Sequence, residues 1–266
     1  MSIDLRLTYI GGPTLLLQVG GLRLLIDPTF DPAGVEFRSG AYVLRKTHGP
    51  GLPPGALGRV DAVLLSHDHH FDNLDASGRA FLGEAGTVLT TGAGAERLGG
   101  RARGFTPWQT VDLPAPSGRT LHVTTTPARH GPAHADRGPV VGFVLTLDDD
   151  SRERIYLSGD TVWYEGVQEV SRRFTIRTAV LFMGAARVEA VGPWHLTFTA
   201  AEGVEAARAF GEATIVPVHF EDWEHFSESR PQIDAAFTAA ALGHRLRWLP
   251  RGVETEGARQ IARPST

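Results

Sequence analysis

Apolar residues dominate three short runs near the start of the chain, at residues 5–10, 14–19 and 22–27. A pair of glycines separates each run from the next, at 11–12 and 20–21. Two glycines between apolar runs are typical of a tight hairpin turn, so the pattern predicts an antiparallel β-meander. Residues 28–58 are then rich in Gly, Pro and aromatic residues without clear periodicity. Loops of this length are uncommon unless they cover a site.

Strand and helix patterns are mixed along the rest of the chain. Residues 60–66 are a continuous apolar run typical of a buried strand, and residues 74–84 have helical character. Further strands are predicted at 87–90, 110–113, 121–126, 140–147, 155–158, 179–182 and 214–218, and further helices at 162–173, 199–210 and 232–242. This order indicates a layered α/β or α+β fold with helices on the outer faces of the sheets. No linker interrupts it, so we expect one domain over residues 1–266.

Composition narrows the chemistry. The 266 residues include 26 Lys plus Arg and 30 Asp plus Glu, a formal net charge of −4, and we expect no nucleic-acid partner. Cysteine is absent, which excludes disulfides, Cys nucleophiles and thiolate metal sites, and Lys46 is the only lysine. No run approaches the roughly 18 apolar residues of a membrane span, and the first twelve residues lack the apolar core of a signal peptide. We therefore expect a cytoplasmic protein without a membrane partner.

The histidines gather where predicted strands end. The segment 66–75, SHDHHFDNLD, follows a buried strand and precedes a helix, and His130, Asp160 and His219 each follow another strand. The carboxyl ends of strands are where open α/β sheets place their ligands. Crowding imidazoles and carboxylates together costs desolvation energy unless a cation neutralises them, so the pattern predicts a divalent metal site. Zinc is our first choice, and manganese or iron accepts the same ligands. An exposed turn that merely holds three histidines is the alternative.

With these motifs the sequence resembles the metallo-β-lactamase superfamily, and within it the group of hydrolases that includes L-ascorbate-6-phosphate lactonase. The signature of that superfamily is H-x-H-x-D-H after a strand, followed by a later His, a bridging Asp and a final His. The resemblance implies a four-layer αββα sandwich, and a metal-bound hydroxide that attacks a small-molecule ester, lactone or phosphoester. The metal ligands that it implies are His67, His69 or His70, and His130 for a first metal, Asp72 and His219 for a second, and Asp160 as the bridge.

The sequence departs from the signature at one point. Counted forward from the strand, His69 takes the second His position, but the Asp then arrives one residue late at Asp72. Counted back from Asp72, the two His positions fall on Asp68 and His70, and Asn73 replaces the last His. A one-residue insertion reconciles the two counts, and it leaves open whether His69 or His70 faces the metal. Because Asn73 offers a neutral amide in place of an imidazole, we expect one firm metal and a second that is weak or absent.

Other residues are candidates for proton transfer and substrate binding. Asp72 and His195 are the predicted catalytic residues, since Asp72 would orient the nucleophile or pass a proton to the leaving group. His195 lies in a loop where lactonase-like relatives place a substrate-facing histidine, and a capping or packing role is its alternative. Asp27, which ends the third strand, is expected to orient a ligand histidine. The predicted substrate-binding residues are Arg129, Trp223 and His225, for which ion pairing or packing under a loop is the alternative.

Rival motifs are incomplete. Residues 92–97, GAGAER, lack the third glycine of a dinucleotide-binding turn, and residues 40–47, GAYVLRKT, lack the second glycine of a phosphate-binding loop. No G-x-S-x-G occurs. We therefore expect a metal-dependent hydrolase of a small molecule. A phosphodiesterase or nuclease of the same fold and a non-catalytic metal-binding scaffold are the alternatives, and the sequence leaves the substrate and any oligomer open.

Overall fold

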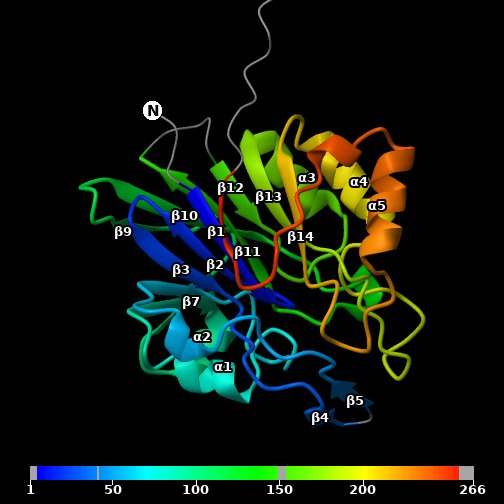
Figure 1. The fold of residues 1–266 in the computed structure, drawn as a ribbon, viewed down its shortest axis with the longest axis horizontal. Helices are drawn as coiled ribbons and strands as arrows, with labels where there is room; N and C mark the ends of the chain where they lie inside the picture. The colour runs from blue at the N-terminus through cyan, green and yellow to red at the C-terminus, as the bar shows by residue number, and fades with distance from the viewer. Residues whose placement is uncertain (1–4, 41, 149–153, 258–266) are drawn as a thin grey trace, which may run out of the picture.

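Two β-sheets pack face to face, and helices cover the outer face of each, in the computed structural model, which describes residues 5–40, 42–148 and 154–257 (Figure 1). The first sheet has seven strands in the order β15-β1-β2-β3-β6-β7-β8, and the second has six in the order β14-β13-β12-β11-β10-β9. The layers therefore run helix, sheet, sheet, helix. This is the predicted αββα sandwich, and the predicted fold class is confirmed.

The first sheet begins as the predicted meander and then becomes parallel. β1, β2 and β3 pair antiparallel, while β3, β6, β7 and β8 pair parallel. Its strands are β1 (Leu5–Gly11), β2 (Thr14–Val19), β3 (Leu22–Ile26), β6 (Ala62–Leu64), β7 (Thr87–Thr91), β8 (Ala102–Phe105) and β15 (Glu254–Glu256). The glycines of the two hairpins have positive φ, for example Gly12 at 51° and Gly20 at 60°, which explains why the turns need them.

The second sheet has the same mixed character. Its strands are β9 (Thr110–Pro114), β10 (Thr120–Pro127), β11 (Val141–Leu147), β12 (Arg154–Leu157), β13 (Ile176–Phe182) and β14 (Thr214–Val218). β9 to β12 pair antiparallel, and β12, β13 and β14 pair parallel. The parallel strands need crossover connections, which the helices of the second half of the chain provide.

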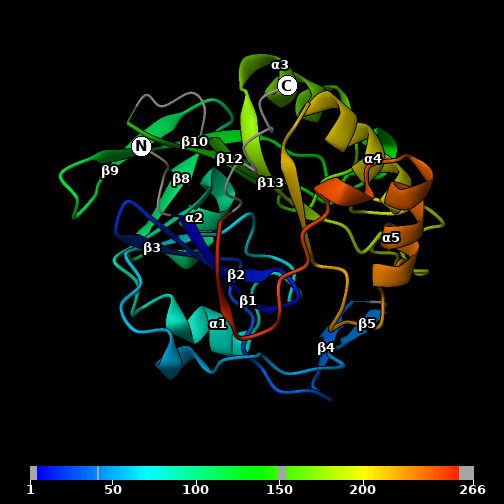
Figure 2. The ribbon, with the colours of Figure 1, turned by 45° about the horizontal axis from the view of Figure 1, so that its top comes forward.

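The helices lie on opposite sides of the two sheets (Figures 1 and 2). On the first sheet they are α1 (Ala76–Phe81) and α2 (Gly92–Leu98), and on the second α3 (Glu165–Arg173), α4 (Ala200–Ala209) and α5 (Arg230–Ala239). Each of α1, α2 and α4 begins at a side chain that caps its first turn, from Asp75, Thr91 and Thr199. None of the helices in the described part of the chain is long and apolar enough to cross a membrane.

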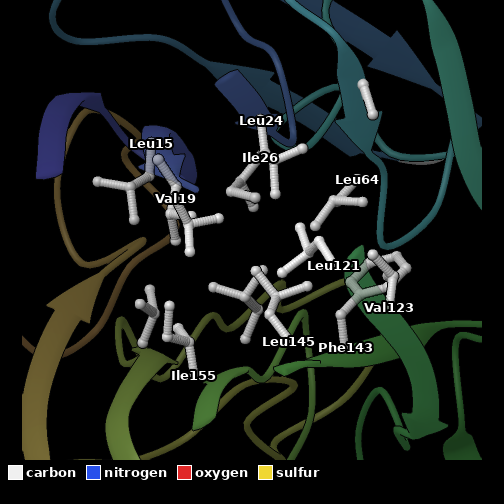
Figure 3. Close-up of a cluster of buried hydrophobic side chains, with 14 of the residues drawn as sticks. Leu15, Val19, Leu24, Ile26, Leu64, Leu121, Val123, Phe143, Leu145 and Ile155 are labelled. Atoms are coloured by element: carbon white, nitrogen blue, oxygen red, sulfur yellow. The ribbon is translucent and has the colours of Figure 1, made fainter. Parts of the chain in front are cut away.

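Alternating side chains build the cores on either side of each sheet. Leu15 and Leu17 of β2 face the other sheet and belong to the same central core as Val123 and Phe143. Figure 3 shows Leu15, Val123 and Phe143 among the side chains of this core. Leu16 between them faces the opposite way, into the core that α1 closes with Phe81. The third core lies between the second sheet and helices α3 to α5. Strands that are buried on both faces explain the continuous apolar runs in the sequence.

The sequence pattern does not predict several of the helices and strands. The segment 28–58 contains a hairpin of β4 (Glu36–Ser39) and β5 (Tyr42–Arg45), and α2 occupies the residues that mimic a dinucleotide-binding turn. β8 and β15 were also missed, and the predicted helices 74–84 and 162–173 prove shorter at one or both ends. β15 and the β4–β5 hairpin are short and polar, so hydrophobic periodicity gives no signal for them.

Candidate metal centre

Four segments that are far apart in sequence bring histidine and aspartate side chains together. His67, His130, Asp160 and His219 lie within three residues of the ends of β6, β10, β12 and β14, and all four are buried. Asp160 lies between the other three. Its Oδ2 is 3.4 Å from His130 Nε2 and 3.9 Å from His67 Nε2, and its Oδ1 is 3.1 Å from His219 Nδ1. The strand-end residues selected in the sequence therefore converge on one place.

His67 is held in one tautomer by the residue before it. Ser66 donates its hydroxyl to Asp27 Oδ2 at 2.6 Å, so its oxygen is left to accept a hydrogen bond from His67 Nδ1 at 2.9 Å. Asp27 also accepts the Ser66 main-chain N–H at 2.6 Å. His67 Nε2 therefore carries its lone pair toward Asp160. Asp27 orients a histidine as expected, but it does so through Ser66.

His130 and His69 are oriented in the same way by main-chain carbonyl groups. A carbonyl oxygen can only accept, so His130 Nδ1 donates to Leu196 O at 2.9 Å and His69 Nε2 donates to Arg137 O at 2.8 Å. The other nitrogen of each ring is then the one with the lone pair. Outer hydrogen bonds of this kind fix the tautomer and direction of metal-binding histidines in proteins.

His70 lies in the same cluster, so the structure brings together both residues between which the sequence left the choice open. His70 Nδ1 is 3.0 Å from His67 Nε2 and 3.1 Å from His130 Nε2. The ring of His69 lies 4.3 Å from that of His70. Burial lowers the pKa of His67 and lowers that of His70 to about 3, so both rings are neutral at pH 7. Neutral imidazole is the form that binds metals.

Asp72 and His219 form a second group around Asp160. Asp72 Oδ2 is 3.4 Å from His219 Nε2 and 3.0 Å from His225 Nε2. Burial lowers the pKa of His219, but Asp160 and Asp72 outweigh it and raise that pKa to about 10. Burial also raises the pKa of Asp160, and the histidines around it outweigh this and hold the pKa below its usual value. Asp160 is therefore ionised. Its Oδ2 faces His67 and His130, and its Oδ1 faces His219.

Asn73 connects the second group to Asp27. Its side-chain Nδ2 donates to Asp160 Oδ1 at 3.2 Å and to Asp27 Oδ2 at 3.1 Å. Burial raises the pKa of Asp27 to about 7, although the hydrogen bonds from Ser66 and Asn73 act to lower it. The amide that replaces the last histidine of the signature thus positions two carboxylates.

The polar atoms of these groups fit a bound divalent cation. Asp160 Oδ2 and His69 Nδ1 are buried without a hydrogen-bond partner among the described residues, and the two ring nitrogens of His219 face the carboxylates of Asp160 and Asp72. Leaving buried polar groups unpaired is costly, and a cation is the natural partner for lone pairs and carboxylates. Ligand atoms within 4.8 Å of one another form three sets: His67, His69 and His70; His67, His130 and Asp160; and Asp72, Asp160 and His219.

A narrow pocket leads to these groups from a wider groove. The inner pocket is about 20 Å³ in volume, close to the space that one water molecule needs. Polar and apolar residues line it: Tyr42, Leu44, His70, Asp72, His130, Arg137, Ala186, Val188, Val191, Leu196 and His225. The outer groove is about 510 Å³ and shares Tyr42, Leu44, Val188 and His225 with the inner pocket. The β4–β5 hairpin forms part of both walls, so the excursion 28–58 does border a site.

Of the other predicted residues, only His225 lies beside the clustered groups. His195 Nε2 is 3.1 Å from Glu202 Oε2, and this hydrogen bond raises the pKa of His195. Arg129 lies over the ring of Tyr164, with its guanidinium carbon 4.3 Å from the ring centroid. Trp223 is buried against Phe37. The structure therefore places these three side chains in contacts outside the cluster.

Some groups that contribute to the site have little or no signal in the sequence. Ser66 passes the influence of Asp27 to His67, and its only signal is its position between the strand and the first histidine. The carbonyl groups of Leu196 and Arg137 orient two histidines, and main-chain atoms have no sequence signal. Arg137 lines the pocket from a loop that has no regular pattern.

The αββα sandwich with His and Asp side chains at its strand ends defines a protein of the metallo-β-lactamase fold class. Residues 22–220 match the family model of the β-lactamase superfamily domain. The chain therefore belongs to that superfamily, as the resemblance of its motifs predicted.

Proteins of similar sequence carry related names. A UPF0173 metal-dependent hydrolase from Opitutus terrae is 28% identical over 265 residues, which cover 95% of this chain and 100% of that protein. Another from Methanoregula boonei is 28% identical over 233 residues, which cover 83% of this chain and 84% of that protein. At the level of the class, the predicted metal-dependent hydrolase of this superfamily is confirmed.

Solved structures agree on the fold. The isothiocyanate hydrolase from Delia radicum gut bacteria has a TM-score of 0.80 at 24% identity, with 95% of this chain and 100% of that chain covered. A metallo hydrolase from the archaeon Ignicoccus hospitalis has a TM-score of 0.70 at 17% identity, with 97% and 100% covered. At these identities the likeness concerns the fold.

Proposed function

We propose that the protein hydrolyses a small-molecule ester, lactone or phosphoester with the help of zinc. The observation that carries this proposal is the cluster around Asp160, in which outer hydrogen bonds direct His67, His69 and His130, and in which Asp160 Oδ2 and His69 Nδ1 have no hydrogen-bond partner among the described residues. A purely structural role would not need this cluster to border a pocket, which His70, Asp72 and His130 line. When bound, a divalent cation lowers the pKa of water to about 7 and polarises the oxygen of the substrate.

The two candidate metal positions differ in the ligands that the chain offers them. The imidazoles of His67, His69 or His70, and His130 favour zinc at the first position, since borderline metals prefer nitrogen ligands. The second position has two carboxylates, Asp72 and Asp160, and one imidazole, so it would bind more weakly and accept manganese or iron. We propose one tightly bound and one weakly bound cation per chain.

Asp72 is the residue that we propose for proton transfer. It lines the inner pocket, and its Oδ2 lies 3.0 Å from His225 Nε2 and 3.4 Å from His219 Nε2. These two rings hold the carboxylate in a fixed direction. A carboxylate so placed can accept the proton of the attacking water and pass it to the leaving group. His225 would position Asp72, which adds to its predicted contact with the substrate.

The size of the two spaces favours a small substrate. The inner pocket has room for about one water molecule, so the body of the substrate must lie in the outer groove of about 510 Å³. A groove of this volume fits a molecule of ordinary metabolite size. A phosphodiesterase acting on a small diester would fit the same groove, and it belongs to the test.

Metal analysis followed by a substrate panel tests the proposal. Purified protein would be assayed for bound metals, stripped with a chelator, reloaded with zinc, manganese or iron, and offered esters, lactones, phosphomonoesters and phosphodiesters. We expect turnover that chelation abolishes and zinc restores. Asp160→Asn should lose metal and turnover while it stays folded, and the exposed Asp112→Asn is the matched control. Protein without metal, or without any turnover that responds to chelation, would contradict the proposal and favour a scaffold.

A further inference from the structure

An arginine, Arg137, lies in the wall of the inner pocket, beside the candidate metal centre. Arg137 lines that pocket together with His70, Asp72 and His130, and it is the only Lys or Arg among the lining residues. It lies in the loop between His130 and β11 and is half-buried. A positively charged residue therefore borders the pocket through which the reacting part of a substrate would enter.

This guanidinium has no partner within the part of the chain that the structure describes. No hydrogen bond, ion pair or ring contact joins its side chain to another described residue. The carboxylate in the pocket, Asp72, is engaged by His219 and His225. By contrast, Arg45 in the outer groove is paired with Glu36 and Glu224. Partial burial costs a charged group part of its hydration energy, and a ligand of opposite charge would compensate for that cost.

The main chain of Arg137 is tied to two of the candidate metal ligands. Its carbonyl oxygen accepts from His69 Nε2 at 2.8 Å, and its N–H donates to His130 O at 2.9 Å. Asp136 Oδ1 accepts main-chain N–H groups from His130 at 3.0 Å and Gly138 at 2.9 Å. The loop therefore holds Arg137 at a fixed place relative to the metal ligands, which is what a specific binding group requires.

Apart from Asp72, which His219 and His225 engage, and the histidines beside it, the rest of the wall is largely apolar. Leu44, Val188, Val191 and Leu196 surround the pocket with apolar side chains. A low-polarity wall strengthens the attraction between a guanidinium and an anion, and the planar guanidinium matches carboxylate and phosphate oxygens. Arg137, the only Lys or Arg of this wall, is thus the side chain that would attract an anion.

We propose that Arg137 binds an oxyanion group of the substrate, a carboxylate or a phosphate, next to the bond that is cleaved. The natural substrate is then an anionic ester, lactone or phosphoester. This inference rests on the proposed hydrolase function for its kinetic half only, because anion binding at Arg137 does not require turnover. Stabilising charge that develops on the reacting group is the competing role, and it would affect neutral and anionic substrates alike.

Two arms of one experiment test the inference on zinc-loaded protein. In the first, inorganic phosphate and acetate are titrated by calorimetry into the wild type, Arg137→Gln, Arg137→Lys and Arg208→Gln. Arg208 is an exposed arginine on α4 and controls for the loss of one surface charge. In the second, the same proteins act on para-nitrophenyl butyrate and on the para-nitrophenyl monoester of glutaric acid, which adds a terminal carboxylate. Zinc content is measured for every variant.

We expect Arg137→Gln to weaken binding of at least one of the two anions about 10- to 100-fold, the usual effect of losing a hydrogen bond to a charged group. The anion that is affected more identifies a carboxylate or a phosphate as the preferred group. KM for the anionic ester should rise by a similar factor, with kinetics on the neutral ester unchanged and an intermediate effect for Arg137→Lys. Unchanged anion binding at equal zinc content, or equal losses on both esters, would overturn the inference. If neither ester is hydrolysed, the proposed function is in doubt while the titration still decides the role of Arg137.

Discussion

Asn73 donates a side-chain N–H to Asp160 Oδ1 at 3.2 Å, from the position where the superfamily signature has its last histidine. The same nitrogen reaches Asp27 Oδ2 at 3.1 Å. An amide in this place holds two carboxylates apart and in position, but its nitrogen offers no lone pair to a cation. Asn73 is thus one reason for the weakness that we propose for the second metal position.

Replacing Asn73 by histidine should therefore strengthen the second position. We expect Asn73→His to raise the metal content of zinc-saturated protein from about one toward about two per chain, measured by elemental analysis after dialysis. Asn73 is fully buried, so the larger ring is expected to cost about 1–3 kcal/mol of folding stability. Asn73→Ala is the comparison, since it removes the amide without adding a ligand. A folded Asn73→His protein with unchanged metal content would contradict this account.

Ser66→Ala should loosen the first position. The substitution removes the hydroxyl that links Asp27 Oδ2 to His67 Nδ1, and it leaves His67 free to change tautomer. Loss of such an outer contact typically lowers metal affinity about 10- to 100-fold. A competition titration with a chromophoric chelator measures this. Ser158→Ala removes another buried hydroxyl, one that bonds a main-chain carbonyl, and should leave affinity unchanged. Equal effects of the two variants would show that the loss is one of general packing.

The location of the site was predictable from sequence because its signal is local. His130, Asp160 and His219 each follow an apolar strand, and strand ends of one sheet meet at an edge. The direction of each side chain was not predictable, since it depends on partners far along the chain. His69 is fixed by a carbonyl 68 positions away and His130 by one 66 positions away. Neither partner has a pattern that a sequence can reveal.

The same limit applies to the fold. The meander and the buried strands were recognised from apolar runs, whereas α2 was missed because its glycines and alanines carry no amphipathic pattern. Its start is marked only by Thr91, whose side chain accepts the Gly94 N–H at 2.9 Å. The partner of His195 was not predictable from its loop either. The ring lies against Glu202, within the capping box of α4, where the sequence suggested a contact with the substrate.

Metal removal should lower the stability of the fold as well as abolish any activity. Asp160 Oδ2 and His69 Nδ1 are buried without a hydrogen-bond partner among the described residues, and a bound cation would supply one. A ligand at 100 times its Kd stabilises the native state by about 2.7 kcal/mol. We therefore expect chelation to lower Tm measurably and zinc to restore it. An equal Tm with and without the chelator, in protein shown to have contained metal, would contradict a cation at this site.

The His195–Glu202 pair should give a small pH dependence to stability. The hydrogen bond that His195 donates to Glu202 raises the pKa of His195 above its usual 6.5. The contribution of this pair to stability is therefore fully present below the unfolded-state pKa and is lost as pH rises through the folded-state pKa. The ring is partly exposed, and we expect less than about 1 kcal/mol. Urea unfolding from pH 5.5 to 8.5 should show this slope in the wild type and a shallower one in His195→Gln. Unchanged kcat for His195→Gln would assign the residue to structure, and a large loss of kcat would restore its predicted catalytic role.

Lys46, the only lysine, should matter for folding and not for chemistry. Its Nζ lies 2.8 Å from Asp75 Oδ2, and both side chains are buried, with exposed fractions of 2% and 0%. Asp75 also accepts main-chain N–H groups from Phe30 at 2.9 Å and Asp31 at 2.7 Å, so it ties the start of α1 to the loop after β3. Removing one partner of a buried ion pair costs about 3–5 kcal/mol, because the other charge stays behind. We expect a loss of that size for Lys46→Met in urea unfolding, little change for the exposed Arg38→Met, and full turnover in any Lys46→Met protein that remains folded. A loss below about 1 kcal/mol would mean that Asp75 is held by its main-chain donors alone.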